Sequence, residues 1–410
     1  LGINDNLYEE IWEFSDEFKI RPWFQSYIYY YIIKILQLLK FENPFIWIFT
    51  IKFLFSFLGV FVFILFYLNF KNRLFVDNNF NRIFILLFCF YPFFHSRTSS
   101  ENLGMTFFLI GFLFFDFILK LKRNNKQFYY ELLAGIFFGL AIITRYQILI
   151  FVFAIYLWVV IYSLNYNNIK SLIVIGLNII LVLLSGLVFD SFGYQELNIT
   201  YYNYFYTNFI SGMLDNFGRD PWWFYFLEIP KSFFPPIGLL FIIAFIYLVY
   251  KKYNNLIVFI SFFYFIIFIF IGHKELRFLF PLLFFSPFFI CAFLDSFIEY
   301  KLIKFMKTLI FFFNFVFLII FSLIPATEQV SIYKYIYKNK NNLSNIYYEE
   351  DNPYFVAGLN PKLYTHYLPK IKKINDYNKD EYFHLITRDQ SKVKNLLNIK
   401  CVKSYSVYPD

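Results

Sequence analysis

The sequence has 410 residues, of which 59% are hydrophobic, 26% are aromatic and only 16% are charged. A soluble domain carries about 25% charged and 45–50% apolar residues, so this composition excludes an ordinary soluble enzyme and a disordered chain and predicts a protein with many membrane spans. The formal net charge of +9 is explained by basic residues that set membrane topology and by contact with anionic lipid headgroups. The sequence has no basic patch interleaved with stacking aromatic residues, so nucleic acid is not predicted as a partner. The three cysteines form no CxxC pattern, so neither a zinc site nor a disulfide framework is predicted.

Residues 1–44 are predicted to form an outer or lumenal loop that contains an interfacial helix. The loop opens with a polar, acidic stretch and holds no signal peptide. Because the first residue is Leu1 rather than Met, we expect the chain to be part of a longer gene product. Residues 24–39 carry Lys34 within an apolar run, which predicts an amphipathic helix at the membrane surface with the lysine snorkelling.

Residues 45–324 are predicted to form the transmembrane domain, with about ten helices that cross, or nearly cross, a hydrocarbon core of about 30 Å. The apolar runs lie at 45–69, 83–95, 103–119, 131–144, 147–164, 171–190, 233–250, 255–271, 276–297 and 305–324.

Every second connection between these runs is basic. The basic residues gather in the linker 70–82, in the linker after residue 119, at Lys170, at 251–252 and at 301–307. By the positive-inside rule these linkers face the cytoplasm. The remaining connections, among them the long loop 191–232, are then predicted to face outward.

Residues 325–410 are polar and are predicted to form a small soluble α/β lobe on the outer or lumenal side. The expected elements are strands at 354–358, 382–388 and 401–407, a helix at 390–398, and a turn at Gly358–Pro361.

The segment HKELRF, residues 273–278, packs four ionisable groups where an apolar run meets the outward face. If the segment is helical, His273 and Arg277 share one face, with Lys274 beside them. Several cationic donors at headgroup depth suit a lipid-linked phosphate. A snorkelling helix end that only anchors the segment explains these residues equally well.

Three other outward stretches carry residues that could bind a substrate. In SRTSSENLG, Arg97 could bind an anion and Glu101 a hydroxyl, although Ser-Ser-Glu before an apolar run also fits a helix cap. Arg145 lies between two apolar runs, where a charge normally faces a cavity or a partner. Trp222 could stack on a sugar ring, although an interfacial aromatic belt is the commoner fate of such a residue.

Six motifs in chain order resemble glycosyltransferase family 22, the α-mannosyltransferases of the GT-C superfamily that act on lipid-linked oligosaccharides and GPI anchors, together with bacterial relatives. SRTSSE stands in place of the family's R-T-x-S-N-x-x-E, and FGRDPWWFY in place of G-x-x-P-W-x-W-Y. The resemblance covers about residues 8–300. The motifs are WEF (12–14) followed by IRPWFQSYIY (20–29), SRTSSE (96–101), GLAIITRYQ (139–147), FDSFGYQ (189–195), FGRDPWWFY (217–225) and HKELRFLFP (273–281).

The resemblance implies an all-α, polytopic membrane protein of GT-C type that is a glycosyltransferase. It would move mannose, with inversion, from a polyprenyl- or dolichyl-phosphate donor to a lipid-linked glycan or glycolipid acceptor on the outer or lumenal face. No metal ligands and no cofactor beyond the lipid-phosphate sugar are predicted. The family's catalytic carboxylate belongs to an Asp-Glu pair in the first outward loop. The context of that pair is not found here, so we expect it upstream of Leu1 and name no catalytic residue.

The resemblance also assigns binding residues by position. For the donor phosphate these are His273, Lys274, Arg277 and Arg145. For the acceptor or the sugar they are Glu13, Arg21, Arg97, Glu101, Gln147, Trp222 and Glu275.

Two other classes remain open from the sequence: a flippase or transporter of lipid-linked glycans, and an enzyme similar to O-antigen ligases or polymerases. A flippase should carry a charged path at mid-bilayer depth, whereas Lys52 and Asp116 are the clearest intramembrane charges. Compact loops favour a bacterial inner-membrane protein, with the endoplasmic reticulum membrane as the alternative.

Overall fold

The computed structural model describes residues 12–120, 125–233, 235–297, 301–323, 328–343, 345–349, 351–355, 365, 367–374 and 384–387. The chain forms two compact units, which are described in turn. The larger unit comprises Asp16–Ile28 and Ile51–Ser322, and the smaller one comprises Leu1–Ser15, Tyr29–Thr50 and Leu323–Asp410.

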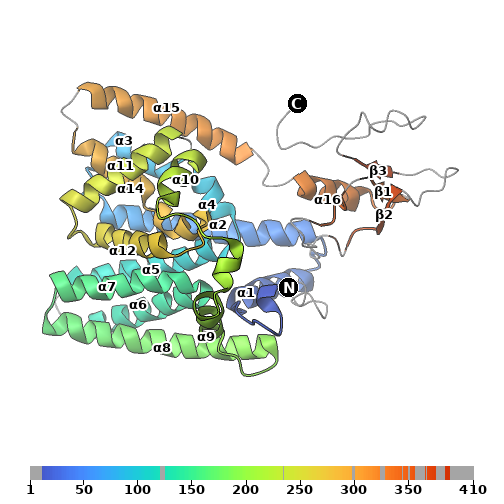
Figure 1. Ribbon diagram of the computed structural model, residues 1–410, viewed down its shortest axis with the longest axis horizontal. Coiled ribbons are helices and arrows are strands. Elements are labelled where there is room, and N and C mark those ends of the chain that lie inside the picture. Colours follow the sequence, from blue (N-terminus) through green and yellow to red (C-terminus); the bar gives the residue numbers. More distant parts are fainter. Residues whose placement is uncertain are drawn as a thin grey trace. The chain divides into compact units, whose positions relative to one another are not determined.

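The larger unit is built from helices and their connections (Figure 1). Helix α1 (Phe24–Leu38) begins in it, and most of α2 (Pro44–Phe70) belongs to it. The other helices are α3 (Asn79–Leu86), α4 (Tyr91–Ser96), α5 (Ser100–Lys120), α6 (Asn125–Thr144), η2 (Tyr146–Ile148), α7 (Leu149–Tyr162), α8 (Tyr166–Tyr194), α9 (Thr200–Phe205), η3 (Tyr206–Ile210), η4 (Met213–Phe217), α10 (Phe224–Ser232), α11 (Pro235–Lys251), α12 (Leu256–Phe270), η5 (Leu276–Leu279), α13 (Phe280–Leu283), α14 (Ser286–Asp295) and α15 (Lys301–Leu323).

Five helices among the described residues are long and apolar enough to cross a membrane, namely α2, α5, α6, α8 and α15. Two bent pairs raise the number to seven if each counts as one span: α11 with α12, bent by 116°, and the helices of 276–283 with α14, bent by 57°. The structure therefore supports an integral membrane protein with five to seven spans, and the ten predicted spans are not confirmed.

Several predicted spans are broken or short, and prolines account for two of the breaks. The run 83–95 forms α3 and α4 rather than one helix, and α4 begins with a proline in its first turn. The run 276–297 breaks before α14, which also has a proline in its first turn. Proline lacks a backbone N–H and clashes with the preceding turn, so it fits the start of a helix but not its interior. Hydropathy alone does not register these breaks.

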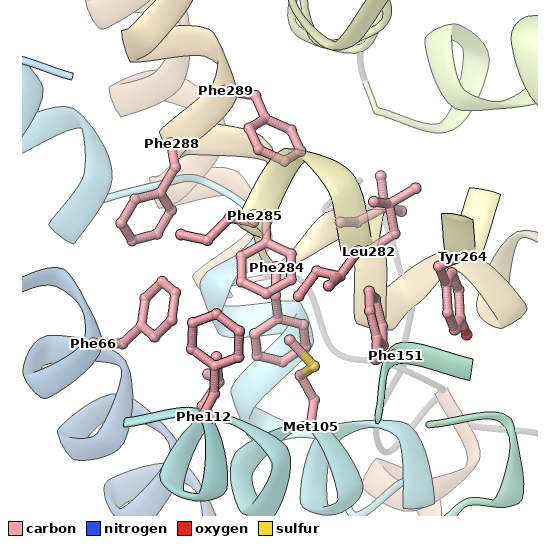
Figure 2. Packing of buried hydrophobic residues seen from close by; sticks show 14 of the residues in the cluster. Phe66, Met105, Phe112, Phe151, Tyr264, Leu282, Phe284, Phe285, Phe288 and Phe289 are labelled. Carbon is pink, nitrogen blue, oxygen red and sulfur yellow. The ribbon is translucent and has the colours of Figure 1, made fainter. Parts of the chain in front are cut away.

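Helix α5 lies at the centre of the larger unit. It packs on α6, and α6 packs on α8. Phe66 of α2 meets Phe112 of α5 and Phe288 of α14, with ring centroids 5.8 and 5.4 Å apart (Figure 2). A helix that is apolar on all sides belongs in a core. The two ends of α5 nevertheless carry buried carboxylates, Glu101 and Asp116, and each end holds a polar site described below.

Apolar stripes on α2 and α8 remain uncovered by the chain. Phe53, Phe57 and Phe61 follow at four-residue spacing along α2 and are 58%, 65% and 51% exposed. Ile173, Leu177 and Leu181 form the same pattern along α8. Continuous exposed apolar surface of this kind is typical of helices that face lipid.

The smaller unit contains helix α16 (Glu328–Asn339) and a three-stranded parallel sheet of order β2-β1-β3. The strands are β1 (Ile346–Tyr348), β2 (Ile371–Lys373) and β3 (His384–Ile386). A small buried cluster holds the unit together: Tyr333, Ile336, Ile346, Tyr354 and Leu368.

Some predictions for this unit are confirmed and others are not. Strand β3 lies within the predicted strand 382–388, whereas β1 and β2 were not predicted. Tyr354 lies in a turn rather than in a strand. The strand at 401–407, the helix at 390–398 and the turn at Gly358–Pro361 lie outside the described residues. The predicted helix at 24–39 is confirmed as α1, and its place at the membrane surface stays a prediction.

Candidate functional site

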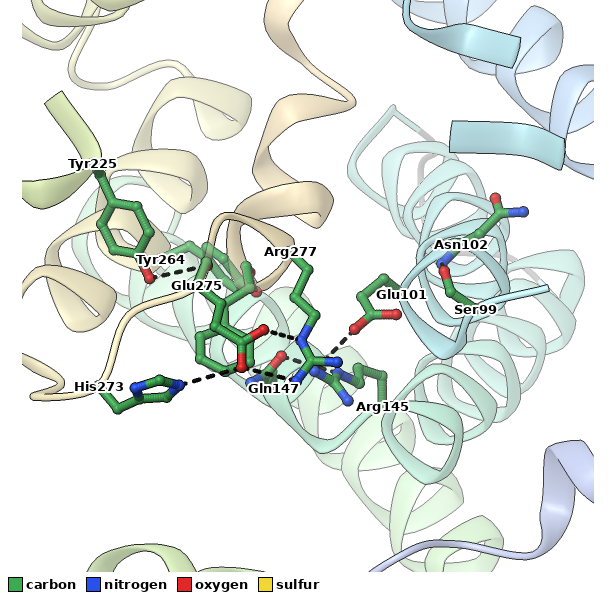
Figure 3. A network of polar contacts seen from close by, with 11 residues as sticks. Ser99, Glu101, Asn102, Arg145, Gln147, Tyr225, Tyr264, His273, Glu275 and Arg277 are labelled. Carbon is green, nitrogen blue, oxygen red and sulfur yellow. Dashed lines mark hydrogen bonds and ion pairs between the residues drawn. The ribbon is translucent and has the colours of Figure 1, made fainter. Parts of the chain in front are cut away.

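A buried ion pair joins the start of α5 to the connection after α6. The Arg145 guanidinium lies 3.0 Å from Glu101 Oε1, and the two side chains are only 7% and 8% exposed. Arg145 Nε also donates a hydrogen bond of 3.0 Å to Gln147 Oε1 (Figure 3). A buried pair is tolerated when its groups satisfy one another. A charge between two apolar runs is expected to face a cavity or a partner, and the partner of Arg145 is Glu101, which lies 44 residues earlier in the chain.

Gly104 makes this pairing possible. A Cβ atom at position 104 would lie 2.6 Å from Ile148 Cδ1 and 3.2 Å from Arg145 Cβ. A side chain there would push the connection between α6 and α7 away from α5. The glycine lies one turn after Glu101, so it lets Arg145 approach at the level of the carboxylate.

The residues before α5 form a capped turn. Ser99 Oγ accepts a hydrogen bond of 3.4 Å from the Asn102 backbone N–H, and Asn102 Nδ2 donates to the carbonyl oxygens of His95 and Arg97. Helix capping therefore explains Ser99 of SRTSSE. Glu101 also interacts electrostatically with Arg97 and Arg21, so cations surround its carboxylate.

The HKELRF segment, called the strap below, is only partly helical: residues 273–275 are non-helical and residues 276–278 lie in the 3-10 helix η5, so the α-helical face that His273 and Arg277 would share does not form. Ile271 and Glu275 have extended backbone angles, and η5 begins only at Leu276. The cause is tertiary: the Asp220 backbone N–H donates a 2.9 Å hydrogen bond to the Gly272 carbonyl, and Lys274 is bound to the same loop.

Glu275 lies between the side chains of His273 and Arg277. His273 Nε2 is 3.2 Å from Glu275 Oε1, and an Arg277 nitrogen donates to the same oxygen at 2.8 Å. Arg277 Nε contacts the second carboxylate oxygen. His273 and Arg277 are thus brought together around one anionic group, as Figure 3 shows. The His273 Nδ1 atom is buried and has no hydrogen-bond partner among the described residues.

Lys274 points away from this group and is 5% exposed. Its ammonium donates to the carbonyl oxygens of Ile271 at 2.5 Å, Asp220 at 3.0 Å and Gly272 at 3.4 Å. Its backbone N–H donates to Asp220 Oδ2 at 3.1 Å. Burial lowers the pKa of the Lys274 ammonium, and the Asp220 charge partly opposes that effect. These bonds fix the strap to the loop before α10, and the contact of Lys274 with a donor phosphate stays a prediction.

We expect Lys274→Met to loosen the loop that precedes α10. Hydrogen bonds from a charged group contribute about 1.5–3 kcal/mol each, so the loop should open at least tenfold more often. Trypsin cleavage after Arg219, followed by mass spectrometry of the fragments in detergent, measures this opening. Lys231→Met is the matched control, because the Lys231 side chain is 74% exposed and forms a surface ion pair with Glu228. Equal cleavage rates after Arg219 in both variants would contradict the positioning role.

Two tyrosines donate hydrogen bonds to backbone carbonyls of the strap, and one of them also lies near the buried ion pair. The Tyr225 hydroxyl donates to the Glu275 carbonyl at 3.4 Å, and the Tyr264 hydroxyl donates to the Phe278 carbonyl at 2.7 Å. Tyr264 also interacts electrostatically with Arg145, which places the ion pair beside the strap (Figure 3). Both tyrosines were missed, because 36 tyrosines give no single one a signal in the sequence.

The motifs IRPWFQ and FDSFGYQ form a second contact in the larger unit. The Trp23 backbone N–H donates to Asp190 Oδ1 at 2.7 Å, and the Tyr194 hydroxyl donates to the Arg21 carbonyl at 2.7 Å. A Cβ atom on Gly193 would lie 2.2 Å from Trp23 Cγ, so only glycine leaves room for the indole. Asp190 was not among the predicted site residues. A carboxylate within an apolar run was the signal that could have identified it.

Trp222, a predicted acceptor residue, lies apart from these contacts. Trp222 is 60% exposed, and its ring packs against Trp223 and Phe226 at centroid distances of 5.6 and 6.2 Å. Within the described ranges, no ion pair or hydrogen bond joins Trp222 to Arg145 or to the strap. Glu13 is half-buried in η1 (Trp12–Phe14), which belongs to the smaller unit. In the part of the chain that the structure describes, no cluster of three or more His, Cys, Asp or Glu side chains could hold a metal ion.

The chain also matches a known protein family. The chain matches the Alg9-like mannosyltransferase family over residues 8–357, which exceeds the range of 8–300 covered by the motifs. The chain therefore belongs to this family. No solved structure matches it.

Two curated relatives are fungal proteins. GPI mannosyltransferase 3 of Candida albicans is 29% identical over 187 residues, which are 46% of this chain and 36% of that protein. A probable Dol-P-Man:Man(7)GlcNAc(2)-PP-Dol alpha-1,6-mannosyltransferase of Schizosaccharomyces pombe is 28% identical over 152 residues, which are 36% of this chain and 27% of that protein. The matched stretches thus span about a third of the first relative's length and about a quarter of the second's.

Proposed function

We propose that this protein is a glycosyltransferase that moves mannose from a polyprenyl-phosphate donor to a lipid-linked glycan or glycolipid acceptor in the membrane. Membership of the Alg9-like family supports mannosyl transfer. The name of the second relative includes Dol-P-Man as donor and a PP-Dol-linked glycan as acceptor. This supports a donor and an acceptor that are both linked to lipid.

The observation that carries the proposal is the arrangement of His273, Glu275 and Arg277. The Glu275 carboxylate occupies the fork of the Arg277 guanidinium, and such a fork fits carboxylate and phosphate alike. A donor phosphate would therefore take the place of the Glu275 oxygens and bind Arg277 and His273. The buried His273 Nδ1 adds a polar atom that a ligand could satisfy.

The ion pair of Arg145 and Glu101 would form the polar floor beside the donor phosphate. Because Arg145 is already bound to Glu101 and Gln147, its charge acts on the site as part of this fixed network. A preorganised charge stabilises a transition state without the cost of reorganisation. Tyr225 and Tyr264 would hold the strap against this floor.

The reaction would invert the anomeric centre and take place on the outer or lumenal face. The orientation follows from the basic linkers, which lie at the opposite end of α5 from Glu101. Both curated relatives are fungal, which favours the endoplasmic reticulum membrane over the bacterial inner membrane that the sequence favoured.

A transfer assay with two donors tests the proposal. Membranes that contain the full chain are given radiolabelled mannose either as polyprenyl-phosphate mannose or as GDP-mannose, with an extracted pool of glycolipid acceptors. We expect the label to reach the acceptor pool from polyprenyl-phosphate mannose. When the synthesis of new lipid-phosphate mannose is blocked, GDP-mannose should give no labelled acceptor. Movement of lipid-linked glycan across vesicles without any sugar transfer would instead make the protein a carrier.

A further inference from the structure

A cavity lies at the end of α5 that is remote from Glu101. Its volume is about 420 Å³. Asp116 follows Glu101 by four helical turns, so at 1.5 Å per residue the cavity lies about 22 Å from the candidate site along the helix axis. The residues that line it come from α2, α5, α7, α12 and the linkers next to them.

The polar side of the cavity holds two cations that share one carboxylate. The Arg73 guanidinium donates to the two Asp116 oxygens at 2.5 and 3.1 Å, and the Lys120 ammonium lies 2.6 Å from the same group. Asp116 is almost fully buried, with a side chain 5% exposed, whereas the side chains of Arg73 and Lys120 are 35% and 39% exposed. The cluster therefore has an excess positive charge, and its cations rather than its carboxylate are open to a ligand.

The remaining walls are apolar. Phe70, Leu74, Leu119, Trp158, Leu256 and Ile257 line them. Trp158 has its Nε1–H bound to the Asn254 carbonyl at 2.8 Å, so the indole presents its carbon skeleton as wall. An apolar cavity with a few convergent polar groups is the usual form of a small-molecule site. Here the polar groups select an anion, and the walls select a hydrocarbon chain attached to it.

One further cation is bound next to the wall of the cavity. Lys252 donates to the Leu74 carbonyl at 2.9 Å, whereas Lys71 and Arg82, in the linker and helix that follow α2, both pair with Asp77, at 3.1 and 3.4 Å. This is the end of the bundle that carries the basic linkers, and the leaflet on that side is the one rich in anionic lipid.

We propose that this cavity binds an anionic glycerophospholipid, with the phosphate on Arg73 and Lys120 and part of an acyl chain along Phe70, Leu119 and Trp158. The lipid would stabilise the contact of α5 with α2, α7 and α12 at the cytoplasmic end. The proposal is independent of the proposed function, because no residue of the cavity belongs to the strap or to the pair of Glu101 and Arg145.

Native mass spectrometry of the purified full chain tests this site. The protein is titrated in detergent with phosphatidylglycerol or phosphatidylcholine, and the first bound lipid is measured. We expect phosphatidylglycerol to bind about fivefold or more tightly than phosphatidylcholine, since one basic residue near a headgroup contributes about 1 kcal/mol. Lys120→Gln should remove that preference while it leaves the pair of Arg73 and Asp116 intact. Leu119→Trp should fill the cavity and weaken binding of both lipids.

Lys304→Gln is the matched control, because Lys304 is an exposed lysine at the start of α15 outside the cavity and its loss changes the net charge equally. Equal binding of the two lipids by the unmodified protein, or equal effects of Lys120→Gln and Lys304→Gln, would overturn the proposal. Glycerol phosphate is added as a competitor. Displacement of the lipid by glycerol phosphate at equal concentration would show a site for a soluble phosphate ester instead of a lipid.

Discussion

Arg277→Ala should lower the kcat of mannosyl transfer by about 10²–10³, the usual loss when one preorganised donor to a developing charge is removed. The phosphate of the donor gains charge as the glycosidic bond breaks, so a cation on it acts more strongly in the transition state than in the ground state. The effect should therefore fall on kcat as well as on KM. Initial rates against the concentration of polyprenyl-phosphate mannose separate the two.

Two further variants make this result specific. Arg277→Lys should restore only part of the rate, because an ammonium cannot reproduce the two parallel hydrogen bonds of the guanidinium. Arg82→Ala removes an arginine with a side chain 50% exposed, close to the 52% of Arg277, and should leave the rate unchanged. If Arg277→Ala transfers mannose at the normal rate, the chain still belongs to the family, but the donor phosphate does not bind at this strap.

The side chains that meet in the strap could be singled out from the sequence, whereas the conformation of the strap could not. Four ionisable residues within five positions mark this segment, and His273 and Arg277 both contact Glu275. The non-helical backbone before η5 depends on Asp220, which lies 54 residues before Lys274. Because sequence spacing carries no information about a contact of this range, a shared helical face for His273 and Arg277 could be stated only as a condition.

Proline positions held more information about the spans than hydropathy did. The chain places prolines in the first turns of α4 and α14, and each marks a helix start within a continuous apolar run. Phenylalanine lies on both sides of these breaks, so the mean hydropathy of the sequence stays high across them and does not reveal them. Asp190 and Asp116 show the converse case, since a single carboxylate in an apolar run marks a buried contact although the sequence does not name its partner.

The ion pair of Arg145 and Glu101 should contribute both to the stability of the fold and to the rate of mannosyl transfer. A double variant separates these two contributions. Arg145→Met leaves the Glu101 carboxylate buried without its partner, which should cost about 3–5 kcal/mol of stability. Glu101→Leu should cost a similar amount for the same reason. Thermal unfolding in detergent, followed by tryptophan fluorescence, measures both losses.

The double variant Arg145→Met/Glu101→Leu should recover most of the lost stability, because apolar side chains of similar volume replace a buried pair at little or no cost. If the pair forms the floor of the donor site, the double variant should fold and still transfer mannose at a small fraction of the normal rate. Recovery of the rate together with the stability would mean that the pair only joins α5 to the connection after α6. The side chains are 7% and 8% exposed, so the loss of stability in the single variants cannot be attributed to solvent-screened surface charge. The difference between the rates of the double variant and of the unmodified protein then reports the contribution of this charge pair to the chemical step alone.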